Sequence, residues 1–156
     1  MTRRIRVLLA GAGIFACATS QAELSHSTWY AQTSLYTRHF SPDPEHNNRQ
    51  DLLGLERHDG KGRLIGGASF RNSFGQRSTY GYYGRRFDMD ASPVFFKLTA
   101  GLLHGYRGEY RHKIPLNHFG IAPAVIPAAG IQHQALAAEV LLLGAAATMV
   151  NVSVRF

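Results

Sequence analysis

Cysteine, acidic residues and helical periodicity are all scarce in this chain of 156 residues. The single cysteine, Cys17, excludes an intramolecular disulfide and a metal site built from cysteines. Asp and Glu number 10 against 17 Lys and Arg, which gives a formal net charge of +7. Such an excess is compatible with nucleic acid, a membrane surface or an anionic lipid as partner. The eight histidines have no local spacing that suits metal ligands, so we expect no metal site.

The first 22 residues have the pattern of a cleaved export signal. A cationic segment at 1–6 precedes a short apolar segment at 7–18, and Ser20-Gln21-Ala22 is a small-x-small cleavage site. Cleavage after Ala22 removes three of the arginines and leaves 14 basic and 10 acidic side chains, a net charge of +4. This charge is too mild to indicate a nucleic-acid partner. The predicted mature domain, residues 23–156, has no cysteine, which suits passage through an oxidising periplasm.

Two other interpretations of this segment fit less well. Residues 11–16 match the dinucleotide-binding fingerprint G-x-G-x-x-A, but no long amphipathic helix follows, as that motif requires. A lipoprotein signal ending at Cys17 would place Phe15 where a small residue is expected. We therefore predict a signal peptide at 1–22 and a single domain at 23–156.

Short alternating segments dominate the rest of the chain, where no segment repeats apolar residues at helical spacing. At the C-terminal end, Val150, Val152, Val154 and Phe156 share one face, and polar residues occupy the other. This alternation, ending on an aromatic residue, is typical of the last strand of an outer-membrane barrel. The pattern predicts strands near residues 27–39, 51–58, 63–71, 78–87, 93–103, 116–130, 135–143 and 148–156. Each approaches the length that crosses a thin membrane at a tilt.

The predicted connections alternate in length. Segments 59–62 and 88–93 are short turns, whereas 40–50 and 104–115 are longer and polar, an asymmetry that outer-membrane barrels show. The apolar segment 135–150 is too short for one spanning helix of roughly 20 residues; two strands fit better than a helical hairpin or a single anchor. The fold class is therefore predicted as all-β, an eight-stranded antiparallel transmembrane barrel of the bacterial outer membrane.

Aromatic residues gather near the predicted strand ends. There they can form girdles at the membrane surface, although packing in an ordinary β core is the alternative. The residues are Trp29, Tyr30, Phe40, Phe74, Tyr80, Tyr82, Tyr83, Phe87 and Phe156.

The first and third predicted strands run in the same direction, so a histidine and a serine at their ends are expected at the same rim. His39 ends the first predicted strand, and Asn72-Ser73 follows the third, so their loops should be neighbours on the extracellular side. An imidazole within reach of a hydroxyl can take and return a proton in acyl transfer. The alternatives are turn chemistry for Asn72-Ser73 and a solvated side chain for His39, and His46 competes with His39 for any such role. Since an eight-stranded barrel has little lumen, a porin is not expected.

The mature chain resembles the lipid A palmitoyltransferase (PagP-type) family over nearly its full length. The resemblance is carried by segments whose order and approximate spacing match the family. They are Thr28-Trp29, Gly54-Leu55 with Asp59 and Gly62, Phe70-Arg71-Asn72-Ser73, Gly81-Tyr82 with Gly84, Ile114-Pro115-Leu116 and Arg155-Phe156.

This resemblance implies an enzyme that moves a palmitoyl chain from a phospholipid to a lipid A hydroxyl. It implies Ser73 and His39 as catalytic residues, with Asn72 standing where the family has an aspartate. Gly84 matches the glycine that sets acyl length, although a strand bend is its alternative explanation. Pro123 and Pro127 match prolines that interrupt strand pairing to admit lipids.

Arginines near the predicted rim suit the phosphates of a lipid A partner. Arg71 and Arg77 are the expected substrate-binding pair, although such arginines also suit any lipopolysaccharide leaflet. We expect no cofactor, because the phospholipid already carries the activated ester, and a monomer. Two other classes stay open, a non-enzymatic structural or binding barrel and a solute transporter.

Overall fold

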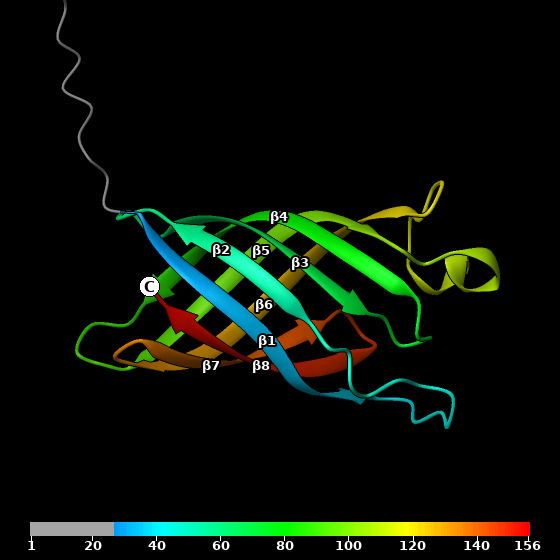
Figure 1. The fold of residues 1–156 in the computed structure, drawn as a ribbon, viewed down its shortest axis with the longest axis horizontal. Helices are drawn as coiled ribbons and strands as arrows, with labels where there is room; N and C mark the ends of the chain where they lie inside the picture. The colour runs from blue at the N-terminus through cyan, green and yellow to red at the C-terminus, as the bar shows by residue number, and fades with distance from the viewer. Residues whose placement is uncertain (1–26) are drawn as a thin grey trace, which may run out of the picture.

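The computed structural model describes residues 27–156, so the predicted signal peptide lies outside the described part. Eight antiparallel strands close into one barrel in chain order, as predicted (Figure 1). The strands are β1 (Thr28–His39), β2 (Leu53–His58), β3 (Arg63–Arg71), β4 (Arg77–Asp88), β5 (Val94–His104), β6 (Ile121–His133), β7 (Leu136–Leu143) and β8 (Ala147–Arg155). A short 3₁₀ helix, η1 (Gly108–Lys113), lies in the loop between β5 and β6.

Most predicted strand boundaries fall within two residues of the observed ones, but the sixth was wrong. Its predicted start at 116 precedes the observed start, Ile121, and it was expected to end at 130 rather than at His133. Leu116, Phe119 and Gly120 have positive φ angles of 58°, 54° and 83°, so this segment turns although its apolar residues mimic a strand. Segment 135–150 forms β7, a turn and β8, and not a helix.

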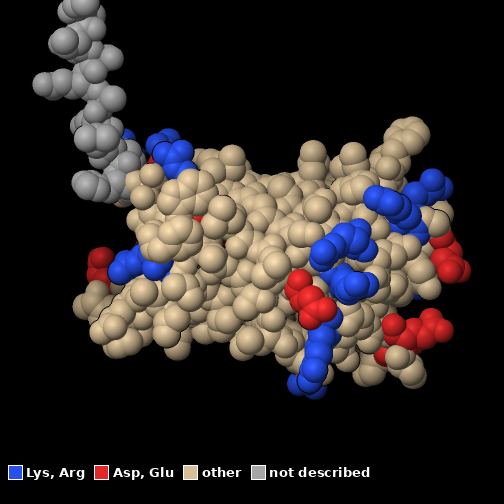
Figure 2. Space-filling view, in the orientation of Figure 1, with Lys and Arg blue, Asp and Glu red and all other residues tan. Residues whose placement is uncertain are grey.

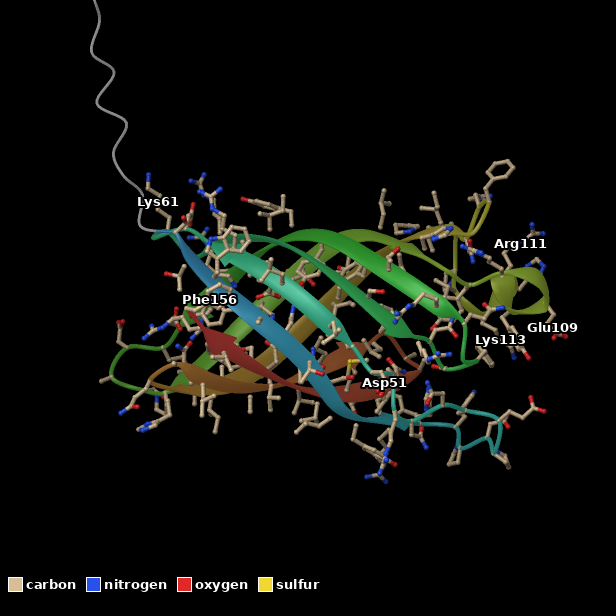
Figure 3. All side chains as sticks on the ribbon, in the orientation of Figure 1. Asp51, Lys61, Glu109, Arg111, Lys113 and Phe156 are labelled. Carbon is tan, nitrogen blue, oxygen red and sulfur yellow. The ribbon has the colours of Figure 1, made fainter. Side chains whose placement is uncertain are left out.

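The two longest connections lie at one end of the barrel, and the connections at the other end are all short. The turns at 59–62, 89–93 and 134–135 lie at one end, and the loops at 40–52, 72–76, 105–120 and 144–146 lie at the other. Figure 3 shows Lys61 and Phe156 at the turn end, with Asp51, Glu109, Arg111 and Lys113 at the loop end. The residues expected to form the site are therefore carried by the loop end.

The wall of the barrel is apolar outside and mixed inside, the reverse of a water-soluble barrel. Outward-facing residues such as Leu53, Ile65, Leu102 and Val140 are exposed. Charged side chains gather toward the two ends of the face in Figure 2 and leave an uncharged band between them. Among residues 27–156, no helix is long and apolar enough to span a membrane. A closed wall with such a band satisfies its backbone internally and suits contact with lipid.

The aromatic residues divide between the two faces. Trp29, Tyr83, Phe87 and Phe156 are exposed near the turn end, whereas Tyr30, Tyr80 and Tyr82 are buried in the lumen. The girdle interpretation was therefore wrong for those three tyrosines. Tyr80 and Tyr82 stack on each other at 4.7 Å between ring centroids.

A buried polar network crosses the lumen in the half of the barrel that is nearer the turn end. The ammonium of Lys97 lies 2.9 Å from Glu56 Oε1 and 2.7 Å from Glu139 Oε1. Tyr82 donates a hydrogen bond of 2.8 Å to Glu56 Oε1, and His58 Nε2 lies 2.8 Å from Glu56 Oε2. These contacts tie β2, β4, β5 and β7 together across the barrel. We call Glu56, His58, Tyr82, Lys97 and Glu139 the lumen network.

A bulge in β1 decides which side chains enter the upper lumen. Against β8, Ser34 pairs with Asn151 and Tyr36 with Val150, so Leu35 is an additional residue. Before the bulge, even-numbered residues such as Gln32 face inward; after it, Thr37 and His39 do. Bulges re-aim side chains in this way beside functional sites. Without the extra residue, His39 would face the outside.

Candidate functional site

His39 and Ser73 meet at the loop end of the barrel. His39 ends β1, Ser73 lies in the loop that follows β3, and Nε2 of the imidazole is 2.7 Å from Oγ of the serine. This distance is within the range for a nucleophile and its base. The structure thus brings together two of the predicted catalytic residues, and parity and loop position were sufficient to expect this.

The second nitrogen of His39 has a partner that the sequence did not reveal. Nδ1 lies 2.9 Å from Oδ1 of Asn48, in the loop after β1. An amide oxygen only accepts hydrogen bonds, so Nδ1 carries the proton toward it. Nε2 then keeps its lone pair and accepts the hydrogen bond from the Ser73 hydroxyl. The three side chains thus form a Ser–His–Asn chain.

The two loops that carry these groups are joined by their backbones. Asn47 N donates to Ser73 O at 2.7 Å, and Arg71 N donates to Gln50 O at 2.7 Å. The Asn47 side chain adds a bond of 3.3 Å to the carbonyl of Asn72. These contacts hold the loop after β3, which carries Ser73, against the loop that follows His39.

Asn72, the third predicted catalytic residue, has partners other than His39. Its side chain is fully buried. Oδ1 accepts bonds of 3.0 Å from the backbone amides of Phe74 and Gln76, and Nδ2 donates to Ser78 Oγ at 3.1 Å. Asn72 therefore shapes the turn that presents Ser73, and the contacts to the imidazole come from Asn48.

This arrangement predicts how position 72 responds to substitution. Asn72→Ala removes the acceptor for two amides in a buried turn and should destabilise the protein by about 1–3 kcal/mol, with a matching loss of activity. In Asn72→Asp the carboxylate can still accept from both amides and from the Ser78 hydroxyl, so folding and activity should persist near neutral pH. Urea unfolding and activity of both variants test this. An alanine variant with wild-type stability would contradict it.

Tyr106 brings a protonated phenol next to Ser73. It lies in the loop after β5, and Ser73 is a polar neighbour of its phenol. Burial raises the pKa of the Tyr106 phenol, and the nearby Ser73 offsets only part of that effect. The phenol therefore keeps its proton near neutral pH and can donate to an oxygen that gains negative charge beside Ser73.

A cavity of about 620 Å³ extends from this site into the barrel. Its volume lies in the range of small-molecule sites. His39, His46, Ser73 and Tyr106 line the mouth, and the lumen network closes the far end. Between them the wall is largely apolar, formed by Leu52, Ala68, Phe70, Leu103, Ala124, Ile126, Ala128, Leu141 and Met149. This shape suits one long apolar chain with its reactive end at the mouth.

Gly84, the expected floor of the acyl site, does not line this cavity. It faces inward on β4, but Tyr82, one inward position nearer the loops, already reaches the cavity end. A side chain at Gly84 would collide with the carbonyl oxygen of Leu98 and with Thr99. In this structure Gly84 therefore permits close packing between β4 and β5, and the residues around Ala128 and Tyr82 limit the depth.

β6 and β7 leave a gap in strand pairing near the loop end. β6 pairs with β7 only from Ala128 to His133, so its upper half has no partner on that side. Pro123 and Pro127 lie in this unpaired half, where their missing donors cost nothing. Val125 faces outward, is 61% exposed and yet lines the cavity. The cavity therefore reaches the part of β6 that lacks a partner strand.

Arg71 and Arg77, the predicted substrate-binding pair, lie on the outer face of the wall. They are directly opposite each other on β3 and β4, and both are exposed. Among the described residues neither forms an ion pair with a carboxylate within 4 Å. Two like charges across a ladder repel, so the pair favours an anion between or above them.

Two residues of the site, Asn48 and Tyr106, were not predicted from the sequence. Asn47 and Asn48 are adjacent asparagines in the same loop, so the sequence does not distinguish them. Only the packing of the loop shows that Asn48 is the one that contacts His39. Tyr106 and Lys113 lie in the long loop that includes η1. Lys113 also lines the cavity mouth, with its ammonium 5.7 Å from the Phe74 ring centre.

Among residues 27–156, no group of three or more His, Cys, Asp or Glu side chains is arranged to hold a metal.

Comparison with known proteins finds a structural likeness but no related sequence. No family model and no curated protein matches the chain. Among solved structures, the chain is similar to the outer membrane protein Ail of Yersinia pestis in a phospholipid bilayer nanodisc. The TM-score is 0.48 and the identity 14%, and the alignment covers 85% of this chain and 99% of Ail. A likeness of this size assigns no activity.

Proposed function

We propose that this protein is an outer-membrane enzyme that transfers a palmitoyl chain from a phospholipid to a hydroxyl of lipid A. The observation that carries the proposal is the 2.7 Å contact between His39 Nε2 and Ser73 Oγ at the mouth of an apolar cavity. The exposed apolar wall supports placement in a bilayer, and the even strand count supports an orientation with the loops and the site on the cell surface.

The cavity would hold the acyl chain of the donor phospholipid. Its lining of alanine, leucine, isoleucine and methionine side chains offers apolar contact along the chain. The gap between β6 and β7 would let that chain enter sideways from the outer leaflet. The ester would then lie at the mouth, beside Ser73.

His39 would act as general base and then as general acid. Its Nε2 takes the proton from the hydroxyl that attacks the ester carbonyl, and it returns this proton to the oxygen of the departing lysophospholipid. The attacking hydroxyl can belong to Ser73, which gives an acyl-serine and a second transfer, or directly to lipid A. Tyr106 would donate to the carbonyl oxygen as negative charge develops on it.

Arg71 and Arg77 would hold lipid A by its phosphates on the outer face. Arginine binds phosphate through two parallel hydrogen bonds, and an anion there relieves the repulsion of the pair. Arg71 precedes Ser73 by two residues, so an acceptor anchored there lies near the site. The donor would thus use the lumen and the acceptor the outer wall.

The lumen network weakens the case for a solute transporter. The contacts among Glu56, Lys97 and Glu139 cross the lumen between β2, β5 and β7 at the far end of the cavity. A non-enzymatic barrel is the remaining rival. It gives no reason for an apolar cavity ending at a serine bonded to an imidazole.

Mass spectrometry of lipid A tests the proposal directly. Lipid A from cells that produce the folded, surface-exposed protein should gain one acyl chain relative to cells without it. A purified preparation in mixed vesicles of phospholipid and lipid A should give the same product together with lysophospholipid. Unchanged lipid A in both systems would refute acyl transfer, and loss of an acyl chain would indicate a deacylase.

The cavity also predicts where chain length is set. Ala128 faces inward on β6 at the deep part of the cavity and is buried. Ala128→Leu should shorten the chain that is transferred, because the larger side chain occupies the space of the terminal methylenes. The mass added to lipid A measures this shift. Leu136→Ala on the outer face is the matched control, and an unchanged chain in Ala128→Leu would show that the chain does not lie along β6.

A further inference from the structure

Asn48 has a contact that the proposed reaction does not by itself require. Its Oδ1 lies 2.9 Å from Nδ1 of His39, on the side of the ring opposite Ser73. Its backbone carbonyl accepts a bond of 2.9 Å from Thr37 N, which joins Asn48 to β1 next to His39. The amide is thus held against the imidazole by the strand that carries the imidazole.

The position of one proton decides whether His39 can act as a base. A neutral imidazole carries its proton on either nitrogen. With the proton on Nε2, the ring would donate to Ser73 and could not take the proton of the hydroxyl. The amide oxygen of Asn48 favours the proton on Nδ1 and leaves Nε2 basic. This is the part that an aspartate or asparagine plays in nucleophile–base–orienter triads.

The ring is also held in orientation by a second imidazole. His46 stacks on His39 with 4.2 Å between ring centroids and 33° between the ring planes, and Phe74 packs edge-on against His46. Rotation of the His39 ring would therefore break two hydrogen bonds and one stacking contact. The site holds the base in one tautomer and in one orientation.

We propose that Asn48 is the positioning residue of a Ser73–His39–Asn48 triad in which Ser73 is the nucleophile. The inference rests on the proposed function only for the identity of the natural substrate. The other titratable groups around the imidazole are His46 from the same loop, and Tyr106 and Lys113 from the loop after β5. None of these contacts Nδ1 in place of Asn48.

Covalent labelling of the purified, folded protein tests the triad without lipid A. An alkyl fluorophosphonate reacts when Ser73 Oγ attacks phosphorus. The O–P bond forms, the P–F bond breaks, fluoride leaves and the hydroxyl proton passes to His39 Nε2. We expect labelling at Ser73, located by peptide mass spectrometry, with a rate that is recorded across the pH range in which the protein stays folded. A wild-type protein that is not labelled at Ser73 would overturn the triad.

Three variants separate positioning from loop structure. Asn48→Ala should lower the labelling rate roughly 10- to 100-fold, a part of the effect that general acid–base catalysis supplies in total. Asn48→Asp should restore most of the rate, and its carboxylate stabilises the imidazolium, so the acid limb of the pH–rate profile should move up by about one pH unit. Asn47→Ala removes a hydrogen bond between the same two loops but no contact with His39. It should therefore leave the pH–rate profile of labelling unchanged.

The outcomes for the triad and for the proposed function are independent. If Asn48→Ala labels at the wild-type rate, or if Asn48→Asp has an unshifted profile, the positioning role is refuted whatever happens to lipid A. If labelling depends on Asn48 while lipid A stays unchanged, the triad stands and the acceptor in the proposed function is wrong.

Discussion

Ser73→Ala is expected to abolish the gain of an acyl chain on lipid A. The hydroxyl is the group 2.7 Å from the base, and alanine leaves His39 with no proton to take from the enzyme. Removal of the nucleophile from such a unit lowers turnover by at least about a thousandfold. The variant should fold normally, because the buried contacts of this turn belong to Asn72. Lipid A mass and the rate of lysophospholipid release measure the loss.

Ser69→Ala is the matched control for this experiment. Ser69 lies on β3 opposite Thr79, near the same end of the barrel. Its replacement should leave the product yield close to that of the wild type. Equal activity in Ser73→Ala and Ser69→Ala, with both proteins folded, would remove Ser73 from the site and with it the proposed chemistry.

Lys97→Met should strongly destabilise the barrel. It leaves Glu56 and Glu139 without their shared cation inside the barrel. Removing one partner of a buried ion pair costs about 3–5 kcal/mol, since the remaining charge is buried and uncompensated. The midpoint of urea unfolding in detergent or vesicles measures the change. Adding Glu56→Gln and Glu139→Gln to Lys97→Met should recover much of the loss.

Arg63→Met provides the comparison for an exposed ion pair. Arg63 contacts Asp59 at 2.6 Å in the turn before β3, and water screens this pair. Arg63→Met should therefore reduce the free energy of unfolding much less than Lys97→Met does. Similar unfolding midpoints for the two variants would indicate that water enters the lumen and solvates Glu56 and Glu139.

Strand alternation sufficed to predict the barrel because a lipid-facing wall makes every second residue apolar. The run from Val150 to Val154 shows this directly, with valines outward and Asn151 buried in the lumen. The sixth strand was misplaced because Leu116 and Phe119 continue an apolar pattern through a loop that turns. Side-chain pattern carries no information about the positive φ angles found there.

The site was predictable to the extent that topology determines it. His39 and Ser73 end strands of the same direction, so their meeting at one rim followed from strand order. The bulge at Leu35, which turns His39 inward, has no sequence signal. Asn48 and Tyr106 depend on how two long loops fold against the barrel, and spacing alone could not select them. Gly84 was assigned by its distance from Ser73 along the chain, which ignores the depth already occupied by Tyr82.

The seam between β1 and β8 has a consequence for the order of assembly. Trp29 and Phe156 exchange backbone hydrogen bonds of 3.2 and 2.9 Å, although almost the whole described chain separates them. Contacts so distant in sequence form late, because the loop they close is long. Until then both seam strands present unpaired amides and carbonyls, which other chains can capture. A factor that shelters these two edges would therefore raise the yield of inserted protein, and the same edges are where aggregation of the exported chain should begin.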